Sequence, residues 1–287
     1  MEQSLTLQSG AEPFPGYTLN HILGRGGYAE VWQATTANGG TVALKFMHSD
    51  DPVSAAKELR AIQSMKAIRH PNLVRIDQVW SVPGHVVFSM ELADGSLMDL
   101  LYAYYEEYGG PIVPEHVCPY LAQAAVAIDF LNAHVHNVDG QIVAFQHGDI
   151  KPSNLLLFGD TVKLADFGLA VPMTNSRVNR NPSGTVQFAA TEVFQGALTD
   201  QTDQFAFAVT YCLLRGGQLP YTDSPTSFRV PYTRPAPDLS MLPEAERQII
   251  ARALSTSPSS RWPSCRAMIE ALARLNKVST SDMAFFR

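Results

Sequence analysis

Alternating apolar and polar residues characterise the first ninety residues of the chain. This alternation predicts five β-strands, over residues 17–23, 30–34, 41–47, 73–79 and 85–90. Asp51-Pro52 is a helix-start signal, and apolar or small residues follow it in helical spacing at Ala55, Leu59, Ile62 and Met65. The pattern therefore predicts a five-stranded antiparallel sheet with one helix.

The remainder of the chain is mainly helical in pattern. Apolar residues in helical spacing predict helices over residues 115–132, 244–254 and 264–275, and the strongly apolar segment 200–214 is predicted to be a buried helix. The stretch 216–243 is rich in proline and is expected to be loop-like. A small sheet-rich lobe followed by a helical lobe indicates a two-lobed α+β enzyme with its ligand between the lobes.

Composition narrows the possible functions. The 287 residues carry a formal net charge of −6 without a basic stripe, which argues against a nucleic-acid platform. No apolar run is long enough to predict a membrane span, and no signal peptide is recognised. The three cysteines lack metal-binding spacing, and their sparse, odd number favours a cytoplasmic location.

A glycine-rich turn and a lysine mark the first candidate site. Gly24, Gly26 and Gly27 lie between two predicted strands, where glycine allows the backbone to approach phosphates closely. Such hairpins are common without ligands, and a dinucleotide-binding motif is rejected because a strand, not a helix, follows. Lys45 ends the run Val42-Ala43-Leu44 on the next strand and could hold phosphates, with Glu58 on the following helix as its partner.

Two short loops supply the second candidate site. Asp149, Lys151 and Asn154 share one loop, and Asp166 follows a strand-like pair in the next. A loop aspartate most often caps a turn, but phosphoryl transfer requires this combination of groups. Asp149 would orient a hydroxyl, Lys151 would neutralise the transferred phosphoryl group, and Asn154 and Asp166 would bind a metal ion. Carboxylate and carboxamide oxygens of this kind suit Mg²⁺.

Taken together, these motifs resemble the eukaryotic-type protein kinase family over about residues 17–275. The resemblance rests on segments in the family's order: Gly24–Val31, Val42–Lys45, Glu58, 70–74, Met90–Ala93, 146–154, Asp166–Gly168, Gly184–Thr185, Ala190–Glu192, Asp203 and Arg261. In the family, the aspartate matching Asp203 braces the catalytic loop, and Arg261 pairs with Glu192. Lys151 and Thr185 resemble the residues that the serine/threonine branch of the family has at these positions.

The resemblance implies a bilobal kinase-like fold that uses ATP and Mg²⁺. The implied boundaries are an N-terminal tail 1–16, a kinase domain 17–275 divided into lobes 17–92 and 93–275, and a C-terminal tail 276–287. Catalysis would depend on Asp149, Lys151, Lys45 and Glu58, with Asn154 and Asp166 on the metal. The implied nucleotide site consists of Leu23, Gly24, Gly26, Gly27, Val31, Ala43, Lys45, Met90, Glu91, Ala93 and Leu156.

The resemblance also implies partners and an internal apolar stack. The substrates would be proteins phosphorylated on serine or threonine, autophosphorylation is possible, and neither nucleic acid nor a membrane segment is expected. An apolar stack of His147, Phe167, Ile62 and Ile76 would join the lobes.

Three departures from the family pattern bear on function. Ala29 replaces the third loop glycine, Thr191 replaces the usual proline, and Gly148 replaces the arginine before Asp149, as in non-RD kinases. That arginine normally pairs with a phosphorylated activation-loop residue, so we expect activity without such phosphorylation. The motif sequences resemble those of bacterial members of the family.

Two other functions compete with an active protein kinase. His147-Gly148-Asp149 also resembles small-molecule phosphotransferases of the aminoglycoside type, which usually lack Asp-Phe-Gly and the closing segment ending in Glu192. A catalytically weak or inactive pseudokinase scaffold is the other alternative. Such proteins typically lose the lysine, the catalytic aspartate or the metal aspartate, whereas Lys45, Asp149 and Asp166 are all present.

Overall fold

The structure is a computed structural model that describes residues 5, 7–26, 29–49, 56, 59, 62–63, 65–179, 183–228 and 232–279. The chain divides into two compact units. The first comprises Met1–Arg69 with Val74–Ala93, and the second comprises His70–Leu73 with Asp94–Arg287. Each unit is described by itself.

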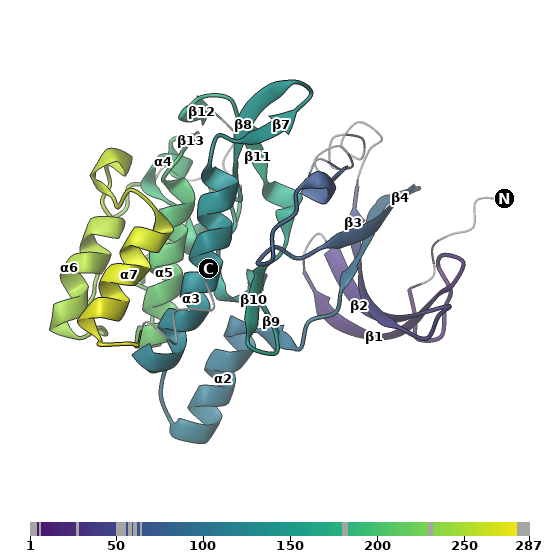
Figure 1. Cartoon of the computed structure of the whole chain (residues 1–287), viewed down its shortest axis with the longest axis horizontal. Helices are drawn as coiled ribbons and strands as arrows, with labels where there is room; N and C mark the ends of the chain where they lie inside the picture. The colour runs from purple at the N-terminus through teal and green to yellow at the C-terminus, as the bar shows by residue number, and fades with distance from the viewer. Residues whose placement is uncertain are drawn as a thin grey trace. The chain divides into compact units, whose positions relative to one another are not determined.

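The first unit contains the predicted five-stranded sheet. Its strands are β1 (Tyr17–Arg25), β2 (Ala29–Thr36), β3 (Thr41–His48), β4 (Ile76–Val82) and β5 (His85–Glu91). All neighbouring strands are antiparallel, in the order β1-β2-β3-β5-β4 (Figure 1). The expected boundaries of the fourth strand are wrong by three residues, because Leu73 forms a bridge with Leu164 and belongs to the second unit.

An aromatic and aliphatic core covers one face of this sheet. Trp32, Leu44 and Phe46 are buried in it, together with Phe14 from the segment before β1. The Phe14 ring stacks on Trp80 with centroids 4.4 Å apart and planes 10° apart. The segment expected to be an N-terminal tail therefore contributes a ring to the core of the sheet.

The predicted helix of this unit is described in part. Ala56, Leu59, Ile62, Gln63 and residues 65–67 are helical. Ile62 and Met65 are buried, as the helical spacing of the apolar residues predicts.

The second unit is mainly helical. Its helices are α2 (Leu97–Tyr108), α3 (Pro114–Asn132), α4 (Thr191–Phe194), α5 (Thr202–Gly216), α6 (Glu244–Ala253) and α7 (Cys265–Leu275). Figure 1 shows α3, α5, α6 and α7 packed side by side, and contacts link α3 to α5 and α7. The four predicted helices are confirmed within about two residues at each end.

Helix α2 had no counterpart in the sequence-based assignment. Its start has a capping box, in which the Ser96 side chain accepts the Asp99 amide and the Asp99 carboxylate accepts the Ser96 amide. Gly109 ends the helix in the left-handed conformation. Ser96, Asp99 and Gly109 were the local signals that could have revealed this helix.

Short strands and single turns position the loops of the second unit. The strands are β6 (Gly95–Ser96), β7 (His136–Val138), β8 (Gln141–Gln146), β9 (Leu155–Phe158), β10 (Thr161–Leu164), β11 (Val171–Met173), β12 (Arg177–Asn179) and β13 (Ala197–Thr199). The 3₁₀ turns are η1 (Pro152–Asn154), η2 (Phe167–Leu169), η3 (Val186–Phe188) and η4 (Pro258–Ser260). Described residues 217–228 and 232–243 contain no helix or strand, in agreement with the expected loop.

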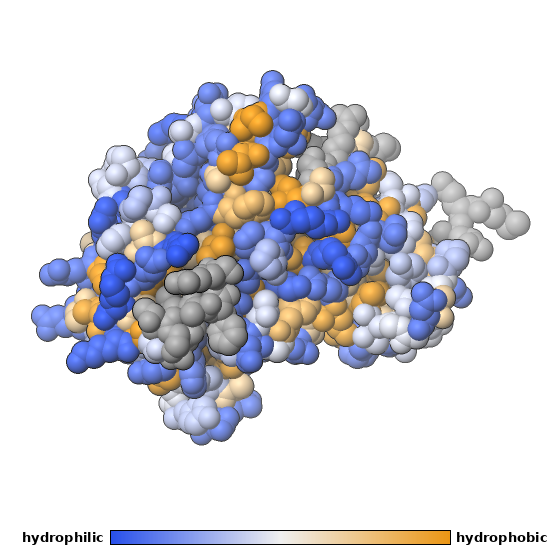
Figure 2. Space-filling view, viewed as in Figure 1, coloured by the Kyte–Doolittle hydropathy of each residue, from blue (hydrophilic) through white to orange (hydrophobic). Residues whose placement is uncertain are grey.

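The segment before the catalytic loop forms a β-hairpin. β7 and β8 are joined by Asp139-Gly140, whose φ angles of 51° and 82° match the tight turn favoured by this dipeptide. β8 continues into pairing with β11. Figure 2 shows apolar residues at the surface near this hairpin, where Val135 and Ile142 are exposed.

Candidate active site

The sheet of the first unit gathers several predicted nucleotide residues on one face. Val31 on β2 lies opposite Lys45 on β3, and Ala43 lies opposite Met90 on β5. Side chains alternate between faces along a strand, so these four residues share a face, while Leu44 and Phe46 enter the core on the other. Lys45 is 8% exposed. Within the sheet, its cross-strand neighbours Val31 and Phe88 are both apolar.

The other predicted nucleotide residues lie at the ends of these strands or outside the described chain. Leu23 and Gly24 are near the end of β1, and Gly26 follows it. Gly27 and Glu58 lie outside the described residues. Glu91 ends β5, and its carboxylate accepts the amide of Arg75 at 2.8 Å, while Ala93 closes this unit. Leu156 lies on β9 of the second unit and is half-buried.

Asp149 is the centre of a hydrogen-bonded cluster in the loop between β8 and β9. One carboxylate oxygen accepts the Thr185 amide at 2.9 Å and the Thr185 hydroxyl at 2.7 Å. The other oxygen lies 2.8 Å from Lys151 Nζ and 3.1 Å from Asn154 Nδ2. The structure therefore brings together three of the predicted residues, Asp149, Lys151 and Asn154, and adds Thr185.

A buried carboxylate from helix α5 holds this loop from behind. The two oxygens of Asp203 accept the amides of His147 at 2.7 Å and Gly148 at 2.9 Å. Asn132 also donates to Asp203, at 3.0 Å. Hydrogen bonds from two consecutive amides orient the backbone directly before Asp149. The bracing role expected for Asp203 is confirmed.

His147 links this loop to the loop that carries Asp166. Its Nε2 lies 2.8 Å from the carbonyl oxygen of Ala165, and its ring meets Phe167 edge-on at 5.6 Å. His147 and Phe167, the two members of the expected apolar stack that belong to the second unit, are therefore in contact. Asp166 itself has a φ of 67°, in the left-handed region, where non-glycine residues are uncommon.

Asn154 and Asp166 are suitable ligands for a hard cation. The amide of Ala165 donates to the carbonyl of Asn154 at 2.9 Å, which keeps the two loops adjacent. Because Nδ2 of Asn154 is engaged with Asp149, its amide oxygen remains available to coordinate a metal ion. No group of three or more His, Cys, Asp or Glu side chains that could hold a metal occurs among the described residues. Two oxygen ligands leave most of the coordination shell to phosphate and water, as Mg²⁺ prefers.

A buried ion pair fixes the segment that follows Thr185. Arg261 donates to both oxygens of Glu192, at 2.8 Å and 2.7 Å. The Arg261 side chain is fully buried, and Thr202 donates to the same carboxylate at 2.8 Å. The predicted pairing of Arg261 with Glu192 is confirmed.

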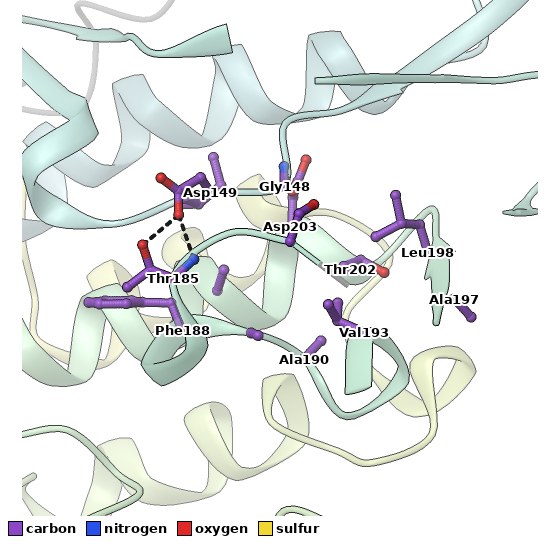
Figure 3. A pocket seen from close by; sticks show the side chains of 14 residues that line it. Gly148, Asp149, Thr185, Phe188, Ala190, Val193, Ala197, Leu198, Thr202 and Asp203 are labelled. Carbon is purple, nitrogen blue, oxygen red and sulfur yellow. Dashed lines mark hydrogen bonds between the residues drawn. The ribbon is translucent and has the colours of Figure 1, made fainter. Parts of the chain in front are cut away.

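Gly184 and Thr185 provide a contact that the sequence analysis did not foresee. Gly184 has a φ of 99°, and a Cβ atom there would clash with the carbonyl oxygen of Gly148. The pair therefore packs directly on the catalytic loop, as the dashed bonds from Asp149 to Thr185 show in Figure 3. The sequence marks Thr185 only through its resemblance to the serine/threonine branch, and the preceding glycine is the available signal of close packing.

A small cavity lies beside this contact. It has a volume of about 20 Å³ and is lined by residues such as Gly148, Asp149, Thr185 and Asp203 (Figure 3). This volume accommodates roughly one water molecule. The cavity is therefore too small to be the nucleotide site.

A family model described as "Protein kinase domain" matches residues 17–272. The chain belongs to the protein kinase family. Its fold is the protein kinase fold, with an antiparallel sheet in the N-terminal lobe and a helical C-terminal lobe. The described residues contain no helix that is both long and apolar enough to cross a membrane.

Similar proteins include bacterial and plant kinases. The chain is 29% identical over 283 residues to serine/threonine-protein kinase PknH of Mycobacterium tuberculosis, covering 94% of this chain and 43% of that protein. It is 30% identical over 284 residues to PknD of the same organism, covering 94% and 40%. It is also 30% identical over 269 residues to CBL-interacting protein kinase 4 of Oryza sativa subsp. japonica, covering 87% and 56%. The chain thus spans about half the length of these relatives.

A solved structure agrees on the fold. The crystal structure of the Mycobacterium tuberculosis PknI kinase domain superposes with a TM-score of 0.70 at 24% identity. The match covers 94% of this chain and 100% of the PknI chain.

Proposed function

We propose that the chain is an active serine/threonine protein kinase that transfers the terminal phosphoryl group of ATP to hydroxyl groups of proteins. The observation that carries this proposal is the cluster of Asp149, Lys151, Asn154 and Thr185. Its members hold a carboxylate, an ammonium group and a carboxamide in contact. The names of the bacterial and plant relatives support the same activity.

In this proposal, Asp149 orients the attacking hydroxyl and accepts its proton. The contacts of Thr185 support that role, because its hydroxyl accepts from Lys151 at 2.8 Å and donates to Asp149 at 2.7 Å. This arrangement fixes the rotamer of the carboxylate before substrate binds. Lys151 lies close enough to neutralise charge on the transferred group.

The first unit would contribute most of the nucleotide residues. Lys45 would bind the phosphates, with Glu58 behind it, and Val31, Ala43 and Leu156 would enclose the adenine beside Met90. The glycines Gly24, Gly26 and Gly27, with Leu23, would cover the phosphates, and the backbones of Glu91 and Ala93 would bind the base edge. Asn154 and Asp166 would hold Mg²⁺, which when bound neutralises the phosphate oxygens.

We further propose that activity does not require phosphorylation of the activation loop. Gly148 removes the arginine that would read such a phosphate. The catalytic loop is instead held to the activation segment by the Asp149–Thr185 hydrogen bonds and by the close approach of Gly184 to Gly148. These contacts involve no phosphate group.

The remaining parts of the proposal concern boundaries, partners and location. We place the kinase domain at residues 17–275, with lobes 17–92 and 93–275. The expected partners are proteins phosphorylated on serine or threonine, including the chain itself. A cytoplasmic location is supported by the three buried cysteines, which are unpaired.

Phosphate transfer from radiolabelled ATP to dephosphorylated casein, together with autophosphorylation, tests the catalytic assignment. Asp149→Asn should lower turnover by about 10²–10⁴-fold with little change in ATP affinity, because the carboxylate acts on the hydroxyl. Asp166→Ala should abolish transfer, and chelation by EDTA should do the same until Mg²⁺ is restored. Asp139→Asn, on the exposed β7–β8 turn, is the matched control and should retain full activity.

Equal losses of turnover and ATP affinity in Asp149→Asn would contradict its assigned role. ATP binding without any transfer by the unaltered protein would instead favour a pseudokinase. Transfer to an aminoglycoside but to no protein would favour the small-molecule phosphotransferase.

Treatment with a broad-specificity phosphatase tests the proposed independence from activation-loop phosphorylation. The initial rate should remain within about twofold of the untreated rate, since no arginine is available to read a phosphate. The variant carrying Thr174→Ala, Ser176→Ala and Ser183→Ala should also keep an initial rate within about twofold of that of the unaltered protein. Thr185 is left unchanged because its hydroxyl contacts Asp149. Loss of activity after dephosphorylation would refute this part of the proposal.

A further inference from the structure

A groove in the helical unit lies apart from the residues assigned to catalysis. It has a volume of about 490 Å³ and is lined by the 234–237 segment, the end of α6 and the turn up to Ser260. Typical small-ligand pockets have volumes of about 300–1,000 Å³. The groove is therefore large enough for a side chain with a bulky polar group and part of the adjoining backbone.

Arg252 presents an uncompensated cation to this groove. Its guanidinium stacks on the Trp262 ring, 4.2 Å from the centroid, which restricts the orientation of the planar group. It donates to the carbonyls of Ser260 and Arg261, both at the long distance of 3.4 Å. Among the described residues it has no carboxylate partner. The N–H groups of Arg252 are thus held in a fixed orientation, but their hydrogen bonds within the chain are long.

Arg234 adds a second positive charge beside the same groove. It is 3% exposed and donates to the carbonyls of residues 186, 187 and 189 and to Ser224 Oγ. Its guanidinium also lies over the Tyr221 ring at 4.4 Å. No carboxylate in the described part of the chain pairs with it, and burial lowers its pKa.

The described residues that line the groove include no acidic side chain. Asp238, which follows Pro237, accepts the amide of Ser240 at 2.9 Å, and Glu192 is paired with Arg261. Two guanidinium groups without carboxylate partners create a positive potential, and an anion entering the groove would be attracted by it.

Three residues with hydroxyl groups line the groove. They are Ser255, Thr256 and Ser260, and their side chains donate no hydrogen bond to the described residues. Pro235 and Pro237 form a rigid apolar wall. A phosphate presents three acceptor oxygens and nearly two negative charges, which matches an arginine fork and several hydroxyls better than a single carboxylate does.

We propose that this groove binds a phosphorylated serine or threonine within an extended segment of a protein partner. Its apolar proline wall favours a peptide over a free anion. The choice of phosphorylated serine or threonine rests on the proposed function, because that reaction produces these groups. Arg234 connects the groove to the carbonyls that follow Thr185, so a partner held here is linked to the activation segment through one side chain.

Isothermal titration with three peptides tests the proposal on the full chain without nucleotide. The probes are Gly-Ala-Ala-phosphoserine-Pro-Ala-Gly, its unphosphorylated form and its glutamate form. The phosphopeptide should bind at least about tenfold more tightly than either of the others, and its affinity should fall as salt is raised. In a Trp32→Phe/Trp80→Phe background Trp262 is the sole tryptophan, so its fluorescence should change on binding.

Arg252→Gln is the decisive variant, and Arg266→Gln is its matched control. Arg252→Gln should weaken phosphopeptide binding by about tenfold or more, because it removes the guanidinium that faces the groove. Arg266 is an exposed arginine of α7 that pairs with Glu270 outside the groove, so Arg266→Gln should change affinity by less than about twofold. Matching thermal unfolding curves would show that both variants are folded.

Three results would overturn the proposal: equal affinity for the phosphorylated and unphosphorylated peptides, unchanged affinity in Arg252→Gln, or inorganic phosphate binding as tightly as the phosphopeptide. The Asp149→Asn variant separates this inference from the proposed function. It should lose transfer and keep phosphopeptide binding. If the unaltered protein bound the phosphopeptide but transferred no phosphate, the groove would stand and the kinase assignment would fail.

Discussion

The two units of the chain position their functional side chains by different physical means. In the sheet unit, Lys45, Ala43 and Met90 are placed by strand register, and the opposite face is stabilised by aromatic packing. In the helical unit, the backbone before Asp149 is held by the buried carboxylate of Asp203, and the Asp149 side chain is held by Thr185. The first arrangement depends on apolar burial, whereas the second depends on satisfying polar groups away from water.

The two units should respond differently to the loss of a side chain. Loss of an apolar side chain from the sheet leaves a cavity, and the resulting destabilisation is limited because neighbouring side chains partly relax into the cavity. Loss of one partner in the loop network leaves a buried charge or donor unsatisfied, which is destabilising for the whole local structure. Local hydrogen exchange can therefore distinguish the two units in the same molecule.

The strongest test of the difference is the buried ion pair of the helical unit. Arg261→Met should lower the free energy of unfolding by about 3–5 kcal/mol, because Glu192 is left buried without its cation. Urea denaturation measures this change. Amide exchange should accelerate around α4 and α7 but stay unchanged in β1–β3. The double variant Glu192→Leu/Arg261→Met should recover part of the loss, and a double variant as unstable as the single one would contradict this explanation.

The corresponding test in the sheet unit is Phe14→Ala. The ring is buried and stacked on Trp80, so its removal should lower the free energy of unfolding by about 3 kcal/mol. Exchange should accelerate in β1–β3, while α3 and α5 stay protected. Tyr17→Phe, which keeps the edge contact with Trp80, is the control. A change in stability below about 1 kcal/mol for Phe14→Ala would show that the segment before β1 is not part of the core.

A pair of glycine variants separates backbone strain from loop contact. Gly184→Ala combines a positive φ with a clash against the Gly148 carbonyl, so it should destabilise the chain by about 1–3 kcal/mol and strongly reduce turnover. Gly140→Ala also has a positive φ, of 82°, but its added Cβ would meet no neighbouring atom within 4 Å. It should cost about 1 kcal/mol and leave turnover unchanged. Equal turnover in the two variants would argue against a catalytic-loop contact at Gly184.

The smallest expected effect concerns a thiol in the apolar helical core. Burial raises the pKa of Cys118 to about 12, above the usual value of 9.0. The unfolded chain loses this proton at lower pH than the folded chain, so stability should fall as pH rises above about 9. Cys118→Ala should make the decline between pH 9 and 10 shallower by up to about 1 kcal/mol, measured by urea denaturation. Parallel declines in both proteins would show that Cys118 does not contribute.

The sequence predicted those features that depend on local periodicity. Alternation predicted the five strands, and helical spacing predicted α3, α6 and α7, because the apolar residues of these elements recur at a fixed interval. The strongly apolar sequence of α5 predicted a buried helix, and nearly all of its residues are buried. It missed α2 and the β7–β8 hairpin, although Ser96, Asp99 and Asp139-Gly140 carried the relevant capping and turn signals. Those signals occupy only a few residues and are easily outweighed by polar surroundings.

The kinds of chemical groups and their order, including Lys45, Asp149 and Asp166, follow from the amino-acid sequence alone. Folding brings the Thr185 hydroxyl to Asp149, packs Gly184 against Gly148, and places Arg234 and Arg252 at one groove. Those contacts join residues well separated in sequence through hydrogen bonds and packing between loops. No periodic pattern encodes such contacts, since they form only when the helices and strands that carry the loops have packed together.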